Sequence, residues 1–306
     1  MTHGVAIVGA GRMGQAHASA WAANGVPVLW AVSPRREPSL VDAPAARWAT
    51  RIDEVLADPA VTIVSICTPT PSHAELAIQA LEAGRCVLLE KPIALTLEDA
   101  ARVEETASRA PGILLVAHVV RFFPGYAALA ERVAAGSVGR PRVVRASRIS
   151  AAPVGYDWLT DEDRSGGMLV DFAIHDIDQA AGYLGEAVAV TSVALDGAGD
   201  GVGFGSPVAT TIEYAGGGIA QLLSVSDLPE GEPFRTGFEV IGDTGVDEAS
   251  PAVGNAFAEQ ARYLLECIAS GTAPSRAPVS AAVEALRVAL AARESARSGR
   301  RVHIAR

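Results

Sequence analysis

Short apolar runs alternate with helical stretches over roughly the first 120 residues. Helical patterns follow several of the runs and extend to about Ala23, over 73–83 and over 97–109. Apolar strands separated by helices are typical of a parallel sheet that is buried on both faces. We therefore predict an α/β fold with a doubly wound parallel sheet here. The predicted strands are 4–8, 28–33, 47–50, 61–67, 86–89 and 113–117.

The pattern changes after residue 120. Strands of alternating polarity now predominate, and short Gly- or Pro-containing connections between the last three long ones indicate antiparallel pairing. A chain of 306 residues exceeds the usual size of one domain, so we predict two domains, 1–120 and 121–306, the second α+β with a largely antiparallel sheet. We expect the Gly-rich stretch 196–205 to be a mobile loop. The predicted helices are 126–135, 168–183, 256–269 and 279–298, and the strands are 142–149, 188–195, 208–214, 219–226, 234–241 and 302–304.

Composition excludes several functional classes. A net charge of −10 argues against nucleic-acid binding, which depends on cationic contacts to phosphate. The longest apolar stretches, 61–67 and 113–120, are far shorter than the roughly 20 residues of a membrane span. No leader pattern precedes the first strand, and three scattered cysteines fit a reducing compartment. We expect a cytoplasmic protein without a metal site.

One residue stands out in the composition. Of the 25 basic residues, Lys91 is the only lysine. A lysine is a compact donor that can lose its proton, whereas arginine is forked and always charged. Lys91 is therefore a candidate for a position that arginine cannot serve, although a chance surface lysine is the alternative.

A glycine pattern joins the first strand to the first helix. It reads Gly9, Gly11 and Gly14, with Arg12 and Met13 between the last two. Such a turn lets a backbone approach a pyrophosphate that rests on the helix N-terminus. This context predicts a nicotinamide dinucleotide cofactor, and the alternative is a glycine-rich turn that has lost its ligand.

The end of the second strand bears on the choice of cofactor. An acid that would bind the ribose 2′-hydroxyl of NAD is missing there, and Ser33 is followed by Arg35 and Arg36. Arginine binds a phosphate through charge-assisted hydrogen bonds, so the sequence favours NADP over NAD. The alternative is that both arginines are solvated loop charges.

Two further segments follow parallel strands at the edge where such sheets bind ligands. Thr68 and Pro69 come after the strand 61–67, and His73 begins the next helix, where it could equally be a plain helix-entry residue. Glu90 and Lys91 come after the strand 86–89. We expect these residues to contact the cofactor.

The helix predicted over 168–183 offers an acid-base pair. Asp171 and His175 are four residues apart and would share one helix face. A carboxylate that orients a histidine suits general acid-base catalysis, and Asp178 could be the orienting group instead. An incidental histidine after an N-terminal helix acid is the alternative.

Together, the glycine fingerprint, Glu90-Lys91-Pro92 and the Gly166-Gly167 pair before Asp171 and His175 resemble the Gfo/Idh/MocA oxidoreductases. The resemblance extends from residue 4 to about 304. It implies a Rossmann domain and an open-faced sheet domain with the substrate between them, contact of Lys91 with nicotinamide and substrate, and a cis bond before Pro92. The expected substrate-binding residues are Lys91, His118, Arg121, Tyr156, Trp158, Asp171 and His175.

The predicted reaction is hydride transfer between nicotinamide and a secondary alcohol or ketone of a sugar, inositol or similar polyol. An enzyme that retains its cofactor for epimerisation or glycosidic cleavage is one alternative, and a non-catalytic ligand sensor is another. An open sheet face favours a homodimer or homotetramer. The short connection over 242–255 departs from the family and leaves the outer wall of the substrate pocket open to question.

Overall fold

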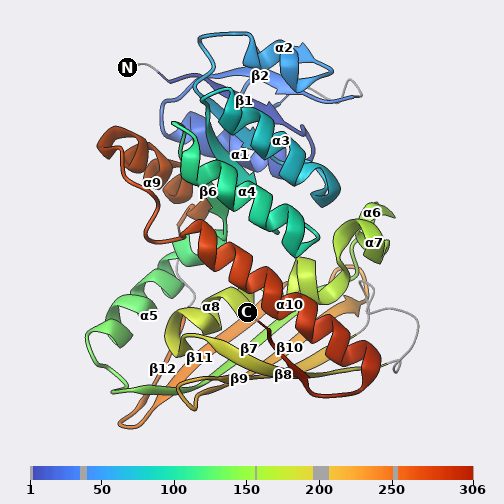
Figure 1. Cartoon of the computed structure of the whole chain (residues 1–306), viewed down its shortest axis with the longest axis vertical. Coiled ribbons are helices and arrows are strands. Elements are labelled where there is room, and N and C mark those ends of the chain that lie inside the picture. The colour runs from blue at the N-terminus through green and yellow to red at the C-terminus, as the bar shows by residue number, and fades with distance from the viewer. Residues whose placement is uncertain (1–2, 35–39, 156, 196–206, 251–253, 306) are drawn as a thin grey trace. The chain divides into compact units, whose positions relative to one another are not determined.

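The computed structural model describes residues 3–34, 40–155, 157–195, 207–250 and 254–305 (Figure 1). Arg35, Arg36, Tyr156 and the loop predicted over 196–205 lie outside the described residues. The chain divides into two compact units. Unit 1 comprises Met1–Phe122 and Gly254–Val283, and unit 2 comprises Phe123–Val253 and Glu284–Arg306.

Unit 1 contains the predicted parallel sheet, with the strand order β3-β2-β1-β4-β5-β6. Every described pairing in it is parallel, and its central strands are fully buried, as their continuous apolar sequence requires. The doubly wound fold is confirmed. The strands are β1 (Val5–Val8), β2 (Val28–Val32), β3 (Arg47–Ala49), β4 (Ile63–Ile66), β5 (Cys86–Glu90) and β6 (Leu114–Ala117).

The helices of unit 1 largely follow the predicted ranges. Thr96 caps α4 by accepting a hydrogen bond from the backbone N–H of Asp99. Helix α9 comes from the far end of the sequence and packs on α1, where Asn24 Nδ2 donates to the Ala258 carbonyl at 2.9 Å. The elements are α1 (Arg12–Ala23), α2 (Ile52–Leu56), η1 (Thr70–Ser72), α3 (His73–Glu82), α4 (Leu97–Arg109), η2 (Val119–Phe122) and α9 (Ala256–Ser270).

Unit 2 is built on a mixed, mostly antiparallel sheet with the order β12-β11-β7-β10-β9-β8-β13. The predicted pairing of the strands at 219–226 and 234–241 is wrong, because β7 lies between them, parallel to β10 and antiparallel to β11. Residues 143–149 of β7 pair with both β10 and β11. The strands are β7 (Pro141–Ala151), β8 (Ala187–Ala194), β9 (Val208–Tyr214), β10 (Ile219–Leu228), β11 (Arg235–Gly242), β12 (Val246–Glu248) and β13 (Val302–His303).

One predicted helix of unit 2 is divided in the structure. The range 168–183 forms a π-helical turn, η3 (Met168–Phe172), and then α8 (Ile174–Leu184), which packs on β7. The backbone N–H of Ala173 donates to the Met168 carbonyl, five residues back, which widens the turn. The remaining helices are α5 (Pro124–Ala134), α6 (Asp157–Thr160), α7 (Glu162–Ser165) and α10 (Val279–Ser298). No helix within the described ranges combines the length and apolar character that crossing a membrane requires.

A buried ion pair joins α8 to the sheet. Arg148 donates to both carboxylate oxygens of Asp176 at 3.0 and 2.7 Å, and its guanidinium lies 5.8 and 5.7 Å from the ring centroids of Phe172 and Phe234. Burial opposes the charge, but the Asp176 carboxylate outweighs it and raises the pKa of Arg148. The other buried positions of β7, Val144 and Ala146, are apolar, and this ion pair anchors α8 on β7.

Removing one partner of this ion pair should be costly. We expect Arg148→Met to lower the free energy of unfolding by ~3–5 kcal/mol, because Asp176 is left buried without its cation. Arg145 on the same strand is a matched control, since its side chain is 63% exposed and pairs with Glu239. Arg145→Met should cost at most ~1 kcal/mol. Denaturant unfolding of the two variants measures both values, and equal losses would show that burial of the pair is unimportant.

Candidate active site

The predicted glycine fingerprint forms a turn that requires glycine at Gly9 and Gly14. Gly9 has φ +94°, and a Cβ there would lie 2.6 Å from the Cys67 carbonyl oxygen. A Cβ on Gly14 would lie 2.1 Å from the Gly9 carbonyl oxygen, so the helix could not pack on the strand. A Cβ on Gly11 would meet nothing within 4 Å, which leaves the start of α1 open to a ligand. These residues fit a dinucleotide whose pyrophosphate rests on the helix N-terminus.

The other predicted cofactor residues of unit 1 gather at the same edge. Val8 of β1 pairs in register with Val32 and Ile66, and Ile66 pairs with Leu89. Ser33, Thr68 and Lys91 therefore follow neighbouring strands at their carboxyl ends. Arg12 is exposed and Met13 half-buried in the first turn of α1, and the Lys91-Pro92 bond is cis, as the resemblance implied.

Glu90 belongs to a buried network that the sequence analysis missed. His17 on α1 places Nε2 2.8 Å from Glu90 Oε1 and Nδ1 2.7 Å from Ser65 Oγ, to which Trp21 Nε1 also donates at 3.3 Å. Burial disfavours the imidazolium, but Cys67 and the Glu90 carboxylate outweigh burial and raise the pKa of His17 to about 10. Burial likewise opposes the Glu90 carboxylate, and His17 and Lys91 together lower its pKa.

A signal for His17 was present in the sequence. It lies three residues after Gly14, on the face of α1 that buries Ala18 and Trp21. A histidine in an apolar helix face that lies against a parallel sheet needs a polar partner. The sequence does not show which strand supplies that partner.

His73 is buried and connects two of the ligand-edge segments. Its Nδ1 lies 2.8 Å from the Pro92 carbonyl oxygen and its Nε2 2.8 Å from the Thr68 carbonyl oxygen. Burial lowers the pKa of His73 despite these two acceptors. A buried ring between two backbone carbonyls braces the segments around Thr68 and Pro92, and the contact of His73 with the cofactor stays a prediction.

The predicted acid-base pair of unit 2 lies where η3 meets α8. Asp171 is buried within the π turn, and His175 is half-buried in the first turn of α8. The two residues are thus not four apart on one regular α-helix as predicted, because the wider turn intervenes. π turns within helices often occur at functional sites. Gly166 and Gly167, both with positive φ, end α7 and begin η3.

The remaining predicted substrate residues differ in their surroundings. Trp158 is half-buried in α6, and His118 is buried just after β6. Arg121 donates from Nη1 to the Arg276 carbonyl at 2.8 Å, while Arg276 Nη2 donates to the Arg121 carbonyl at 2.6 Å. Arg121 thus donates to a backbone group of unit 1.

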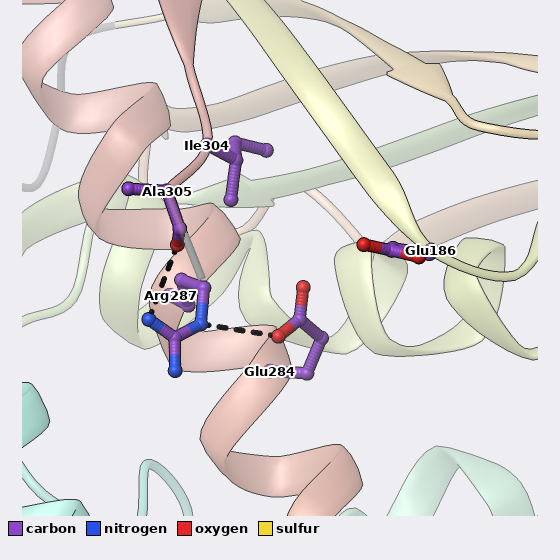
Figure 2. Close-up of a pocket in the computed structure, with 5 residues that line it drawn as sticks. All are labelled: Glu186, Glu284, Arg287, Ile304 and Ala305. Carbon is purple, nitrogen blue, oxygen red and sulfur yellow. Dashed lines mark hydrogen bonds and ion pairs between the residues drawn. The ribbon is translucent and has the colours of Figure 1, made fainter.

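A hollow in unit 2 is separate from these residues. It is lined by Glu186, Glu284, Arg287, Ile304 and Ala305, and Arg287 donates to Glu284 and to the Ala305 carbonyl (Figure 2). None of the predicted site residues lines it. Among the described residues, no group of three or more histidine, cysteine or acidic side chains is arranged to hold a metal ion.

Two family models match the chain. One, described as "Oxidoreductase family, NAD-binding Rossmann fold", matches residues 3–118, and the other, the "GFO/IDH/MocA C-terminal domain", matches residues 126–246. The chain belongs to the Gfo/Idh/MocA oxidoreductases. The resemblance found in the sequence is thereby confirmed, as is the Rossmann fold of the first sheet.

Relatives of this Gfo/Idh/MocA oxidoreductase include proteins named as inositol dehydrogenases. It is 28% identical to scyllo-inositol 2-dehydrogenase (NAD(+)) of Bacillus subtilis (strain 168), across 98% of this chain and 95% of the relative. It is 32% identical to myo-inositol 2-dehydrogenase of Thermotoga maritima, where the alignment covers 60% of this chain and 55% of the relative. A crystal structure of a myo-inositol dehydrogenase from Corynebacterium glutamicum is 25% identical, with a TM-score of 0.84 and full coverage of both chains.

Proposed function

We propose that this oxidoreductase transfers hydride between a nicotinamide dinucleotide and a secondary alcohol or ketone of an inositol, sugar or similar polyol. The observation that carries the proposal is the placement of Lys91. This sole lysine follows β5 at the sheet edge that also carries the Gly9–Gly14 turn. The names of the relatives support a polyol as the substrate class.

The roles of the residues follow from their chemistry. The start of α1 would hold the pyrophosphate, with Thr68 and Pro69 on the neighbouring segment. When bound, nicotinamide supplies the hydride acceptor or donor. Lys91 donates a hydrogen bond that polarises the substrate oxygen, and His175 takes the hydroxyl proton during oxidation and returns it during reduction. Asp171 orients the imidazole and stabilises its charged form.

A panel of inositols, sugars and ketosugars tests the proposal, with reduced nicotinamide followed by its absorbance. We expect at least one polyol to give continuous cofactor turnover. Substrate conversion without net change in the cofactor would instead indicate the cofactor-retaining class. Ligand binding without conversion would indicate a sensor.

We further propose that the cofactor is NADP rather than NAD. Ser33 is buried at the end of β2, where an acid would contact the 2′-hydroxyl of NAD. We expect NADP(H) to bind roughly tenfold to a hundredfold more tightly than NAD(H). This ratio corresponds to the free energy of charge-assisted hydrogen bonds to the 2′-phosphate. Ser33→Asp should abolish or reverse this preference because a carboxylate repels the 2′-phosphate.

Fluorescence titration of both cofactors measures the preference. Ser108→Asp adds the same charge at an exposed position of α4 and should change neither dissociation constant. Equal or NAD-favouring constants in the wild type would contradict the assignment.

We also propose a homodimer or homotetramer formed through the sheet of unit 2. Leu223 and Val193 both pair in register with Ala209, so an apolar row crosses β10, β9 and β8 on an exposed face. That face also carries both signs of charge, with Arg145 paired to Glu239, which lets a second copy be complementary to it.

The three scattered free cysteines fit a cytoplasmic location, which we propose as well.

Sedimentation analysis tests the assembly. We expect Leu223→Asp to give monomers, because the carboxylate would be buried within the interface. Val41→Asp, at an 80% exposed position of unit 1, should leave the assembly unchanged. A monomeric wild type would contradict this proposal.

A further inference from the structure

The buried network around Glu90 adjoins Lys91, the residue that polarises the substrate oxygen in the proposed function. His17 is 1% exposed and Glu90 6% exposed, so the pair is enclosed by protein. An enclosed carboxylate is costly unless its oxygens are hydrogen-bonded and its charge is balanced. Here His17 meets both requirements on one side of the carboxylate.

Both oxygens of Glu90 are used. Oε1 faces His17 Nε2, and Oε2 accepts the backbone N–H of Lys91 at 3.2 Å. The carboxylate thus fixes the peptide group that begins Lys91. On the far side of Lys91, the Pro92 carbonyl is held by His73 at 2.8 Å.

The two histidines tie this short segment to separate elements. His17 belongs to α1, the helix that begins at the dinucleotide turn, and its other nitrogen is fixed by Ser65 of β4. His73 begins α3 and also contacts the Thr68 carbonyl. These contacts therefore fix the position of the Lys91 backbone relative to the same helix and strand ends that would hold the cofactor.

We infer that His17 and Glu90 are positioning residues for Lys91: their buried pair fixes the backbone from which the sole lysine extends. The inference rests on the proposed function for its catalytic consequence, but the positioning can be observed without substrate. An error of about 1 Å in the placement of a reacting group can cost ~10²-fold in rate.

Two substitutions of similar size separate positioning from mere stability. Glu90→Gln can still accept from the Lys91 N–H and donate to His17, whereas Glu90→Met fills the same space without either hydrogen bond. The double variant His17→Leu/Glu90→Met guards against misfolding, since an apolar pair commonly replaces a buried ion pair without loss of stability. His3→Gln is a matched control, because the hydrogen-bond partner of His3 Nδ1 is the Thr62 hydroxyl, at 3.1 Å.

The first readout is the ¹³C signal of the lysine side chain. Protein labelled with ¹³C at lysine Cε gives one lysine signal, since Lys91 is the sole lysine. We expect this signal to move or broaden in Glu90→Met and in the double variant, and to keep its position in Glu90→Gln and His3→Gln. A signal in the same position in all folded variants would overturn the inference.

The second readout is turnover per folded molecule, beside the melting temperature and the dissociation constant of the cofactor. We expect Glu90→Met and the double variant to lose ~10²-fold in kcat at saturating cofactor, and Glu90→Gln to stay within about tenfold of the wild type. A lower melting temperature with wild-type kcat would reduce the pair to a structural role and overturn the inference. No turnover in the wild type on any polyol would instead refute the proposed function, and with it the catalytic consequence, while the lysine signal still decides the positioning.

Discussion

Lys91→Arg is expected to keep the fold while losing ~10²–10³-fold in kcat, the usual cost of removing a donor that stabilises a developing oxyanion. The side chain of Lys91 is half-buried at the start of a short turn held by Glu90 and His73. A forked, planar guanidinium cannot take the place of a compact ammonium in such a setting. Steady-state kinetics with the best polyol from the panel measure the loss.

The reverse exchange provides the control. Arg102→Lys alters an exposed cation of α4 that pairs with Asp99, and it should leave kcat unchanged. Lys91→Arg protein that melts normally and turns over at the wild-type rate would return Lys91 to the class of chance surface lysines.

His175→Ala is expected to lose ~10²–10⁴-fold in kcat/KM, the range for a positioned acid-base group. His175 must be neutral to accept a proton during oxidation and charged to donate one during reduction. Acid therefore protonates the base and lowers the oxidative kcat/KM, whereas the reductive kcat/KM falls as the solution becomes alkaline. The pH profiles of both directions, recorded for the wild type and the variant, check this sign.

Two carboxylates compete as the partner of His175. Asp171 lies in the π turn before α8, and Asp178 lies within α8 itself, one turn beyond His175. If Asp171 orients the histidine, Asp171→Asn should move the inflection of the oxidative profile towards acid, and Asp178→Asn should not. The opposite result would assign the role to Asp178. An unchanged rate and profile in His175→Ala would exclude His175 as the proton acceptor.

The fold could be predicted where the periodicity of the sequence and local chemistry agree. Strands such as β1 and β4 are continuous apolar runs, and the turn after β1 carries Gly9 and Gly14, where a side chain would clash with the backbone. The errors came from long-range pairing. The insertion of β7 between β10 and β11 joins residues 76 to 101 positions apart, from the pair Val143–Ile219 to the pair Pro141–Gly242. Hydrophobic alternation is the same whichever strand is the neighbour.

The sequence indicated the motifs of the candidate site but not the buried residues that hold these motifs in place. The sequence pointed to Lys91, Asp171 and His175 because each has a distinctive type and spacing. His17 and Arg148 escaped notice because their partners, Glu90 and Asp176, are 73 and 28 residues away. The π turn at Ala173 was also missed, since one extra residue in a turn leaves little trace in a helical pattern.

The central claim is that a hydride leaves a polyol carbon and is carried by nicotinamide. The most direct test supplies the polyol with deuterium on the carbon that is oxidised and analyses the cofactor by mass spectrometry. The account predicts that the deuterium appears in the reduced nicotinamide and that the rate falls relative to the protium substrate. Reduced cofactor without deuterium, or deuterium returned entirely to the sugar with no net cofactor change, would contradict it.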